Sequence, residues 1–364
     1  MAAFPPPPTT MMAVVTTGCG GFDKLEYKSV PTPVPGPGEV LLRVLAAGVN
    51  NTEINTRMGW YSSSVKTGTN TMASGDDNKD GDGDDGDNKA AKGGDSKGSS
   101  SSSSSSSAAE DGGWNGATPF PFIQGTDCCG RVAAVGDGAE QQETLVGKRC
   151  LVRCTSAAIG KRWIGSDFDG AFAEYVKIPA SEVFPVDAPG WTDAELGSIP
   201  CAYGTAENMV HRAEVRAGQR VFVPGASGGV ASAVVQLCKR RGASVVVTCG
   251  KGKADALRDL LGLDLEKGGG GGDGGVKDQL FAGRFGDDGW DAFIEGIRSG
   301  SSGGGESAAE GKATGAGEAA VADAAGHVGG VDVVIDNVGG AHFTDMLSIL
   351  KFGGRYVTSG AVGG

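Results

Sequence analysis

The stretch with the clearest chemical meaning is a glycine-rich loop that separates an apolar run from a helix. Residues 221–242 read VFVPGASGGVASAVVQLCKRRG. A strand that enters such a turn and then a helix presents free backbone N–H groups and the positive end of the helix dipole, and both favour a pyrophosphate. The predicted phosphate-binding residues are Ala226, Ser227, Gly228, Gly229 and Val230.

Two interpretations of this loop are open. It could be a tight turn without a ligand, or the phosphate-binding turn of a dinucleotide site. Ala231 occupies the third position of the GxGxxG fingerprint, where alanine is tolerated because that position governs packing of the helix on the strand. The strand–loop–helix context favours a bound dinucleotide.

The end of the next predicted strand distinguishes NAD from NADP. An NAD site usually carries an acidic residue there for the ribose hydroxyls. This chain reads TCGKGK, which has no acid and contributes Lys251 and Lys253. The two cations predict pairing with the 2′-phosphate of NADP, so NADPH is favoured over NADH. The alternative is that both lysines only begin a solvated helix.

These residues need a parallel sheet to position them, and the second half of the chain has the pattern for one. Helical spacing over 192–213 is followed by strand 219–224, helix 228–241, strand 243–249 and helix 253–262. Segments 331–340, 343–354 and 355–364 then read as strand, helix and strand. Strands that alternate with helices predict a doubly wound α/β domain.

The first half has a different pattern. Short runs in which apolar and polar residues alternate, interrupted by Pro and Gly, predict antiparallel strands. They occupy residues 11–21, 25–50, 130–136, 147–154 and 170–179. We therefore predict a β-rich domain over residues 11–189 and a nucleotide-binding domain over 190–364, since 364 residues would ordinarily form two domains.

Two low-complexity segments interrupt these domains. Residues 74–113 are acidic and rich in Ser, and we predict that they are disordered. Residues 266–330 form a Gly-rich insert, interrupted by WDAFIEGIRSG, which could form one short helix. The net charge of −12 resides in these two segments, so it carries no information about a site. The sequence has no cluster of Lys and Arg residues of the kind that binds a nucleic acid.

The cysteines and the apolar runs indicate in which cellular compartment the protein is expected. None of the eight cysteines forms a CxxC pair and no secretory leader precedes them, so we expect reduced thiols in the cytoplasm. No apolar run approaches the roughly 18 residues of a membrane span, so no membrane partner is expected.

Several motifs, in order, carry a family resemblance. They are GPGEVLLRVLAAGVNNTEINTRMGWY, FPFIQGTDCCGRVAAVGDG, GAFAEYVKIPASEVFPVDAPG, the glycine loop with its flanks, and VDVVIDNVGG. Together they resemble the medium-chain dehydrogenase/reductases, which include zinc alcohol dehydrogenases, quinone oxidoreductases and enoyl reductases. The resemblance covers most of the chain outside the two inserts. It implies a GroES-like catalytic domain, a Rossmann domain and a cleft between them.

The resemblance also bears on zinc. At the three positions that match zinc ligands of the alcohol dehydrogenase branch, this chain has Asn50, Thr126 and Cys201. A catalytic zinc needs three protein ligands, so a single thiolate is insufficient and we expect no metal. Cys201 is instead expected to be a small buried side chain. Cys150 and Cys154 alone cannot form the structural zinc site of the family.

The remaining, zinc-free branch implies a set of site residues. In the related enoyl reductases a Tyr eleven residues after the matching Asn is the proposed proton donor, and that position here is Tyr61. The alternative for Tyr61 is a packing role. Asn50 could position the substrate carbonyl or the nicotinamide ribose, or only cap a turn. The resemblance places Thr205 at the nicotinamide end and the strand-end residues Asn337, Val338, Gly360 and Ala361 around the cofactor.

We therefore expect an NADPH-dependent oxidoreductase that transfers a hydride to a quinone or an α,β-unsaturated carbonyl compound without zinc. The alternative is a catalytically inactive or truncated NADP(H)-binding protein with a sensing or scaffolding role. Relatives continue past SGAVGG, so the Rossmann domain is expected to be incomplete at its C-terminus. A homodimer like those of the family would then lack part of its usual surface.

Overall fold

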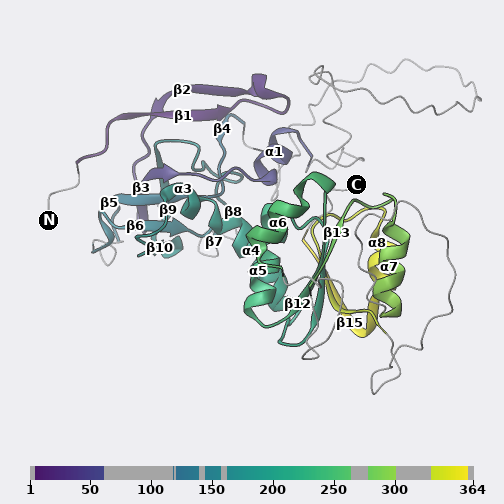
Figure 1. Cartoon of the computed structure of the whole chain (residues 1–364). Coiled ribbons are helices and arrows are strands. Elements are labelled where there is room, and N and C mark those ends of the chain that lie inside the picture. Colours follow the sequence, from purple (N-terminus) through teal and green to yellow (C-terminus); the bar gives the residue numbers. More distant parts are fainter. Residues whose placement is uncertain are drawn as a thin grey trace, which may run out of the picture.

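The computed structural model describes residues 5–60, 118, 120–138, 144–156, 162–263, 278–300 and 329–359. In these parts the chain forms two halves, each around its own β-sheet system, which lie side by side (Figure 1). The acidic segment 74–113 lies outside the described residues, and so do Tyr61, Gly360 and Ala361.

The N-terminal half is built from antiparallel strands. A three-stranded sheet has the order β2-β1-β4, and a five-stranded sheet has the order β10-β6-β5-β3-β9. Strands β7 and β8 form a separate pair. The bounds are β1 Thr10–Thr16, β2 Leu25–Pro31, β3 Glu39–Ala46, β4 Phe122–Ile123, β5 Cys129–Val135, β6 Arg149–Val152, β7 Thr155–Ser156, β8 Arg162–Trp163, β9 Tyr175–Pro179 and β10 Val183–Pro185.

Alternation explains how the five-stranded sheet forms its core. Strand β3 pairs with β5 on one side and with β9 on the other. Val40 and Leu42 are two residues apart on β3 and point to one face, as the two-residue period of a strand requires. They pack with Val132 of β5 and with Val176 and Ile178 of β9, all buried.

The C-terminal half contains a five-stranded parallel sheet in the order β13-β12-β11-β14-β15. Its strands are β11 Arg220–Val223, β12 Ser244–Cys249, β13 Gln279–Ala282, β14 Val331–Asp336 and β15 Leu350–Thr358. The α-helices in the described residues are α1 Asn51–Arg57, α3 Asp193–Gly197, α4 Ile199–Arg212, α5 Gly229–Arg240, α6 Ala254–Leu261, α7 Trp290–Ser299 and α8 Phe343–Ser348. A 3-10 turn, η5 Lys251–Lys253, connects β12 to α6.

Helices cover both faces of this sheet, as the doubly wound prediction requires. Val221 and Val223 of β11 pack with buried residues of α4, α5 and α6, while Phe222 between them packs with residues of α7 and α8. Figure 1 shows the first three helices on the side of the sheet nearer the N-terminal half and the other two on the far side. The predicted fold class, a GroES-like β-rich domain with a Rossmann domain, is confirmed.

The predicted Gly-rich insert contains more structure than its composition indicates. The short helix expected at WDAFIEGIRSG is α7, whose Trp290, Ile294 and Ile297 are buried against the sheet. Strand β13 was not predicted, because its four residues lie in a polar, glycine-rich context. It is held by Asp278, which accepts the Val245 amide at 2.9 Å and pairs with Lys239.

Among the helices that the structure describes, none combines the length and apolar character needed to cross a membrane.

Candidate functional site

The glycine loop lies where the strand order of the parallel sheet reverses. From β11 the chain passes through α5 to β12 on one side, whereas β14 pairs with β11 on the other side. Ligands of doubly wound sheets bind beyond the carboxyl ends of the strands at such a point. The loop after β11 and the loop after β14 meet there, because a Cβ added to Gly225 would lie 3.0 Å from Cγ2 of Val338.

The start of the glycine loop is fixed to the neighbouring strand β12. The Gly225 amide donates to Oγ1 of Thr248 at 3.1 Å, and the Ala226 amide donates to the Thr248 carbonyl at 2.8 Å. Ala226 is fully buried, so it shapes the turn. Ser227, Gly228 and Gly229 are exposed. Gly228 is the N-cap of α5 and provides no side-chain cap, and the first amides of a helix have no acceptor within it.

The space around Gly228 and Gly229 fits a phosphate. Gly228 has a φ of −79°, which any residue adopts, and an added Cβ would come no nearer than 3.4 Å to the Gly225 carbonyl oxygen. At Gly229 the nearest atom would be the Ala202 Cβ of α4 at 3.8 Å. The folded chain therefore does not require glycine at either position. Their lack of a side chain leaves room for a group outside the chain, as a phosphate would need.

A buried carboxylate holds the loop after β14. Oδ1 of Asp336 accepts the amides of Val338 at 2.7 Å and Gly339 at 3.0 Å, and Oδ2 accepts the Tyr356 hydroxyl at 2.7 Å. Burial alone would raise the pKa of Asp336, but hydrogen bonding to its neighbours lowers it to about 2. His342 Nε2 lies 3.5 Å from Oδ2, at the limit of a hydrogen bond. Asp336 therefore remains a carboxylate that orders this loop.

Asn337 presents an unused donor beside the glycine loop. Its Oδ1 accepts the Ser359 hydroxyl at 2.9 Å, while its buried Nδ2 has no hydrogen-bond partner within the described residues. A buried amide donor usually has an acceptor, which a bound ligand would supply here. The orphaned donor therefore also fits a cofactor at this edge of the sheet.

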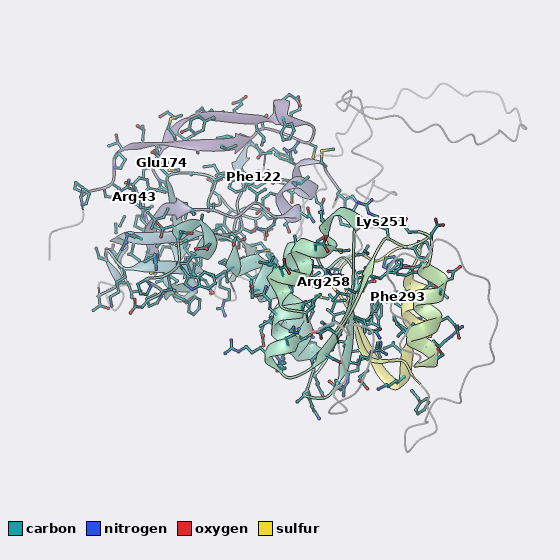
Figure 2. The ribbon with its side chains drawn as sticks, viewed as in Figure 1. Arg43, Phe122, Glu174, Lys251, Arg258 and Phe293 are labelled. Carbon is teal, nitrogen blue, oxygen red and sulfur yellow. The ribbon has the colours of Figure 1, made fainter. Side chains whose placement is uncertain are left out.

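Three further predicted cofactor residues, all described, lie around the same end of the sheet. Lys251 and Lys253 are exposed in η5, directly after β12, and neither forms an ion pair with another described residue. Figure 2 shows Lys251 at the upper end of this half, with Phe293 lower down on α7. Thr205 is half-buried on α4, one turn after the Ala202 that faces Gly229.

Asn50 belongs to a second cluster, at the start of α1. Its Nδ2 donates to Oγ1 of Thr126 at 3.2 Å and to Oδ2 of Asp127 at 2.9 Å. Its backbone amide donates to Oε2 of Glu53 at 2.7 Å, and Oε1 of Glu53 accepts both the amide and the hydroxyl of Thr126 at 2.8 and 2.7 Å. Asn50 is therefore the N-cap residue of α1, and its side-chain amide is bound to the loop before β5.

Asp127 connects this cluster to α4. It is fully buried, and its Oδ1 accepts the Cys201 amide at 2.6 Å. Burial raises the pKa of Asp127 to about 6, although the hydrogen bonds from Asn50 and the Cys201 amide act in the opposite direction. Gly48 makes room for this carboxylate, since a Cβ there would lie 2.7 Å from Oδ2. The cluster therefore joins the two halves of the chain through a carboxyl group that titrates near neutrality.

Cys201 is not the buried side chain that we expected. It is partly exposed, and its backbone amide donates to Oδ1 of Asp127. Within the described residues, no three or more His, Cys, Asp or Glu side chains are arranged to hold a metal ion.

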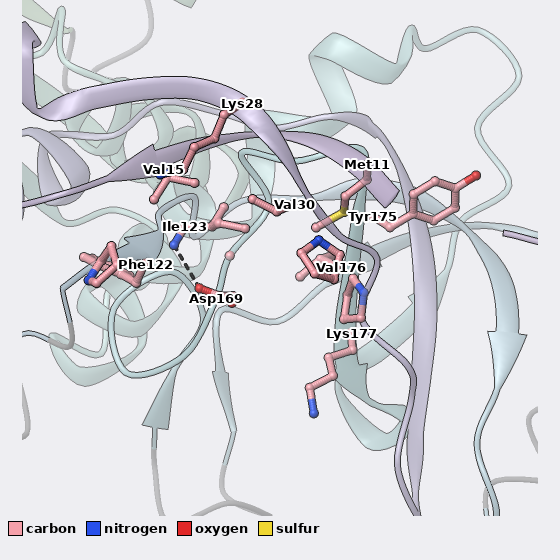
Figure 3. Close-up of a pocket in the computed structure, with 14 residues that line it drawn as sticks. Met11, Val15, Lys28, Val30, Phe122, Ile123, Asp169, Tyr175, Val176 and Lys177 are labelled. Carbon is pink, nitrogen blue, oxygen red and sulfur yellow. Dashed lines mark hydrogen bonds between the residues drawn. The ribbon is translucent and has the colours of Figure 1, made fainter. Parts of the chain in front are cut away.

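A cavity of about 310 Å³ lies elsewhere in the N-terminal half, beneath the β1–β2 hairpin (Figure 3). Its walls are mostly apolar and include Met11, Val30 and Val176. Lys28 and Lys177 at its edge are paired with Glu26 and Glu39. None of the predicted site residues lines it.

Sequence reasoning missed two residues of the second cluster, Glu53 and Asp127. A signal for Glu53 was present, because Asn50 and Glu53 have the spacing of a capping box. For Asp127 there was no local signal, since its partners Asn50 and Cys201 are 77 and 74 positions away in the sequence. The structure places Asn50, Thr126, Asp127 and Cys201 in one connected cluster.

Comparison with known proteins supports this reading of the fold. The model of the alcohol dehydrogenase GroES-like domain matches residues 101–188. The chain is 36% identical over 152 residues to erythronolide synthase EryA2 of Saccharopolyspora erythraea, a match that covers 42% of this chain and 4% of that protein. It is 25% identical over 250 residues to the human synaptic vesicle membrane protein VAT-1 homolog, covering 68% of this chain and 46% of that protein. The chain thus spans less than half the length of either relative.

A solved structure matches over nearly the whole chain. It is that of a protein from Sinorhizobium meliloti described as an alcohol dehydrogenase, with 31% identity and a TM-score of 0.65. The match covers 98% of this chain and 77% of that chain. The paired sheets, the glycine loop at the strand-order reversal and this similarity lead to one conclusion: the chain belongs to the medium-chain dehydrogenase/reductase superfamily of oxidoreductases.

Proposed function

We propose that this oxidoreductase uses NADPH to reduce a quinone or an α,β-unsaturated carbonyl compound without zinc. The observation that carries the proposal is the hydrogen bond from the Asn50 side-chain amide to the Thr126 hydroxyl. These residues occupy two positions that match zinc ligands in the resembling alcohol dehydrogenases, and here they bond to each other at 3.2 Å. Neither an amide nitrogen nor a threonine hydroxyl is a zinc ligand of choice.

The cofactor would be held by the residues around the strand-order reversal. The backbone amides of Ser227 and Gly229 would bind the pyrophosphate, whereas the Gly228 amide already donates to the Gly225 carbonyl at 3.0 Å. Lys251 and Lys253 would pair with the 2′-phosphate, which distinguishes NADPH from NADH. The orphaned Nδ2 of Asn337, with Val338 beside it, would face the nicotinamide half. The bound nicotinamide supplies a hydride, and the protein supplies orientation and electrostatics.

We do not assign polarisation of the substrate carbonyl to Asn50. Both hydrogens of its side-chain amide are used by Thr126 and Asp127, so donating to a substrate carbonyl would break a bond within the cluster. We therefore propose that Asn50 accepts a hydrogen bond from a ribose hydroxyl through its carbonyl oxygen. Proton donation to the reduced acceptor is assigned to Tyr61, whose phenol is protonated at neutral pH.

The test is consumption of NADPH, followed by absorbance, with a small panel of quinones and enals and with NADH in parallel. Tyr61→Phe tests the proton donor. Tyr27→Phe is the matched control, because Tyr27 is 71% exposed on β2. We expect turnover with NADPH that falls about 10²-fold or more in Tyr61→Phe, the usual contribution of general acid catalysis, and that is unchanged in Tyr27→Phe.

Three results would count against parts of this proposal. Equal turnover in Tyr61→Phe would remove Tyr61 from the mechanism. Stoichiometric zinc in the purified protein, with activity lost on its removal, would contradict zinc independence. NADPH binding without reduction of any acceptor would favour the inactive NADP(H)-binding alternative.

A further inference from the structure

Three arginines lie side by side across the five-stranded antiparallel sheet. Arg131 of β5 is directly opposite Arg43 of β3 on one side and Arg149 of β6 on the other. Residues that are directly opposite in an antiparallel pair project to the same face of the sheet, with Cα atoms about 4.5–5.5 Å apart. The register therefore places three positively charged side chains in one row.

The row lies on the face of the sheet that points away from the core of this half. The neighbouring residues Leu42 and Val132 are buried in that core. Since successive side chains of a strand point to opposite faces, Arg43 and Arg131 point outward, and both are exposed. Figure 2 shows Arg43 in the N-terminal half and Lys251 of the proposed cofactor site in the other half.

Arg149 is bound within the fold. Its Nη1 lies 3.3 Å from Oδ1 of Asp193, and its Nη2 donates to the backbone carbonyl of Ala188. Asp193 compensates its charge, and the two contacts hold the segment before α3 on the sheet. Arg43 and Arg131 remain as the exposed part of the row.

Arg43 and Arg131 have no carboxylate partner within the described parts of the chain. Arg131 donates one N–H to the uncharged carbonyl of Gly147 at 2.9 Å, and the Arg43 side chain forms no hydrogen bond or ion pair with a described residue. Glu174, just before β9, instead accepts the Met12 amide at 2.8 Å. Like charges directly opposite each other destabilise a sheet, so this pair costs free energy unless an anion compensates it.

The chemistry of the pair favours a phosphate over a carboxylate. Each guanidinium is a planar fork that donates two parallel hydrogen bonds to an anion. One fork occupies both oxygens of a carboxylate, whereas a phosphate monoester has three terminal oxygens and close to two negative charges, which two forks can share.

We propose that Arg43 and Arg131 bind the phosphate group of a phosphate monoester on the outward face of the antiparallel sheet. The phosphate belongs either to a soluble ester or to a lipid head group. This site is separate from the proposed cofactor site, and it does not depend on the proposed reductase activity.

The experiment titrates the full chain with inorganic phosphate at constant ionic strength and follows the Nε–H resonances of isotope-labelled arginines. The resonances of Arg43 and Arg131 are assigned by their loss in Arg43→Gln and Arg131→Gln. We expect both resonances to shift with one common Kd. Each variant should raise the Kd that the other arginine reports by about tenfold or more, because hydrogen bonds to a charged group are lost. Phosphate that binds at the glycine loop leaves these two resonances unchanged.

Controls separate a binding site from a structural role. Arg216→Gln is the matched variant, since Arg216 is an exposed arginine that pairs with Glu214 at 2.9 Å, and the Kd should not change. In buffer without phosphate, Arg43→Gln should unfold at a temperature no lower than the native chain, because it removes the repulsion between opposite arginines. A lower midpoint would assign Arg43 a structural role and contradict the proposal.

Two further ligands identify the source of the phosphate. Binding of glycerol phosphate without sedimentation on vesicles of phosphatidylcholine and phosphatidic acid would identify a soluble ester. Sedimentation on these vesicles that is lost in the double variant Arg43→Gln/Arg131→Gln would identify a lipid head group.

Four results would overturn the proposal. They are different Kd values at the two arginines, unchanged Kd values in the variants, acetate binding as tightly as phosphate, and no saturable shift with any of these phosphates.

Discussion

At the scale of single residues, the site depends on two buried carboxyl groups with opposite behaviour. At the end of β14, hydrogen bonding from four neighbouring groups lowers the pKa of Asp336 to about 2. Asp127 has fewer donors for the same degree of burial, and its pKa is raised to about 6. One carboxylate therefore fixes a loop at all physiological pH values, while the other changes its charge close to neutrality.

Asp127 should make stability fall as pH rises. A carboxyl whose folded pKa exceeds its unfolded value of 3.8 contributes stability that is present below 3.8 and is lost as pH rises to about 6. For this difference, the change amounts to at most about 3 kcal/mol, at about 1.36 kcal/mol per pKa unit. We expect the free energy of unfolding of the native chain, relative to Asp127→Asn, to decrease by up to this amount between pH 4 and pH 7. Urea denaturation at the two pH values measures it.

Glu195→Gln is a control with the opposite sign. Glu195 is exposed at the start of α3, and hydrogen bonds from the backbone and side chain of Thr192 lower its pKa. The stability that the ionised Glu195 contributes should be lost as pH falls. The free energy of unfolding of the native chain should therefore decrease at low pH relative to that of Glu195→Gln. A flat difference for Asp127→Asn, or one of this opposite sign, would show that burial does not control Asp127.

At the scale of elements, the glycine loop contains one glycine that the backbone conformation requires and another that it does not require. Gly225 has a φ of +65°, and an added Cβ would press on Val338, so its glycine serves the fold. Gly228 has an ordinary φ, and an added Cβ would come no nearer than 3.4 Å to the Gly225 carbonyl oxygen, so only the proposed pyrophosphate would require glycine there. The two positions are three residues apart and make a matched pair for mutation.

We expect Gly225→Ala to lower the free energy of unfolding by about 1–2 kcal/mol, the cost of a left-handed conformation for a residue with a Cβ. Gly228→Ala should lower the free energy of unfolding by at most about 1 kcal/mol, because Ala is a poorer N-cap residue than Gly but adopts this φ without strain. It should nevertheless weaken NADPH binding by about tenfold or more, since about 1.4 kcal/mol of lost contact suffices. Chemical denaturation and fluorescence titration with NADPH measure the two effects. Unchanged affinity in Gly228→Ala would place the pyrophosphate elsewhere.

The turn η5 should decide the choice of dinucleotide. The double variant Lys251→Ser/Lys253→Ser removes two exposed cations that have no described ion-pair partner, so the fold should not change. We expect NADPH affinity to fall about tenfold or more, corresponding to about 1.4 kcal/mol, while NADH affinity stays the same. Lys24→Ser, an exposed lysine of the N-terminal half that pairs with Asp23, is the control. An equal loss for both dinucleotides would contradict recognition of the 2′-phosphate.

At the scale of the whole molecule, the two halves are joined through the Asn50–Asp127–Cys201 connection as well as through the chain itself. A ligand that binds the folded chain alone stabilises it by about 2.7 kcal/mol at 100 times its Kd. NADPH should therefore raise the midpoint of thermal unfolding, and NADH at the same concentration should raise it less.

Treatment with a chelator tests the proposal that the protein works without a metal ion. We expect EDTA followed by dialysis to change neither the midpoint of thermal unfolding nor NADPH turnover. The proposed mechanism assigns a hydrogen bond with the cofactor ribose to Asn50 and proton transfer to Tyr61, and assigns no step to a metal ion. Measurement of bound zinc before and after treatment completes the test, and a fall in activity in step with zinc loss would reverse the assignment.

The sequence by itself determined the two kinds of sheet, the glycine loop and the helix within the Gly-rich insert, because strand alternation, helical spacing and turn residues are local signals. It did not predict β13, whose place at the sheet edge depends on Asp278 contacting residues 33 and 39 positions earlier in the sequence. Only the tertiary structure decided that Asp127 binds both the Asn50 side chain and the Cys201 amide. These contacts join residues 77 and 74 positions apart, respectively, so no local pattern encodes them. The raised pKa of Asp127 has the same origin, since burial is a property of the packed molecule and not of a segment.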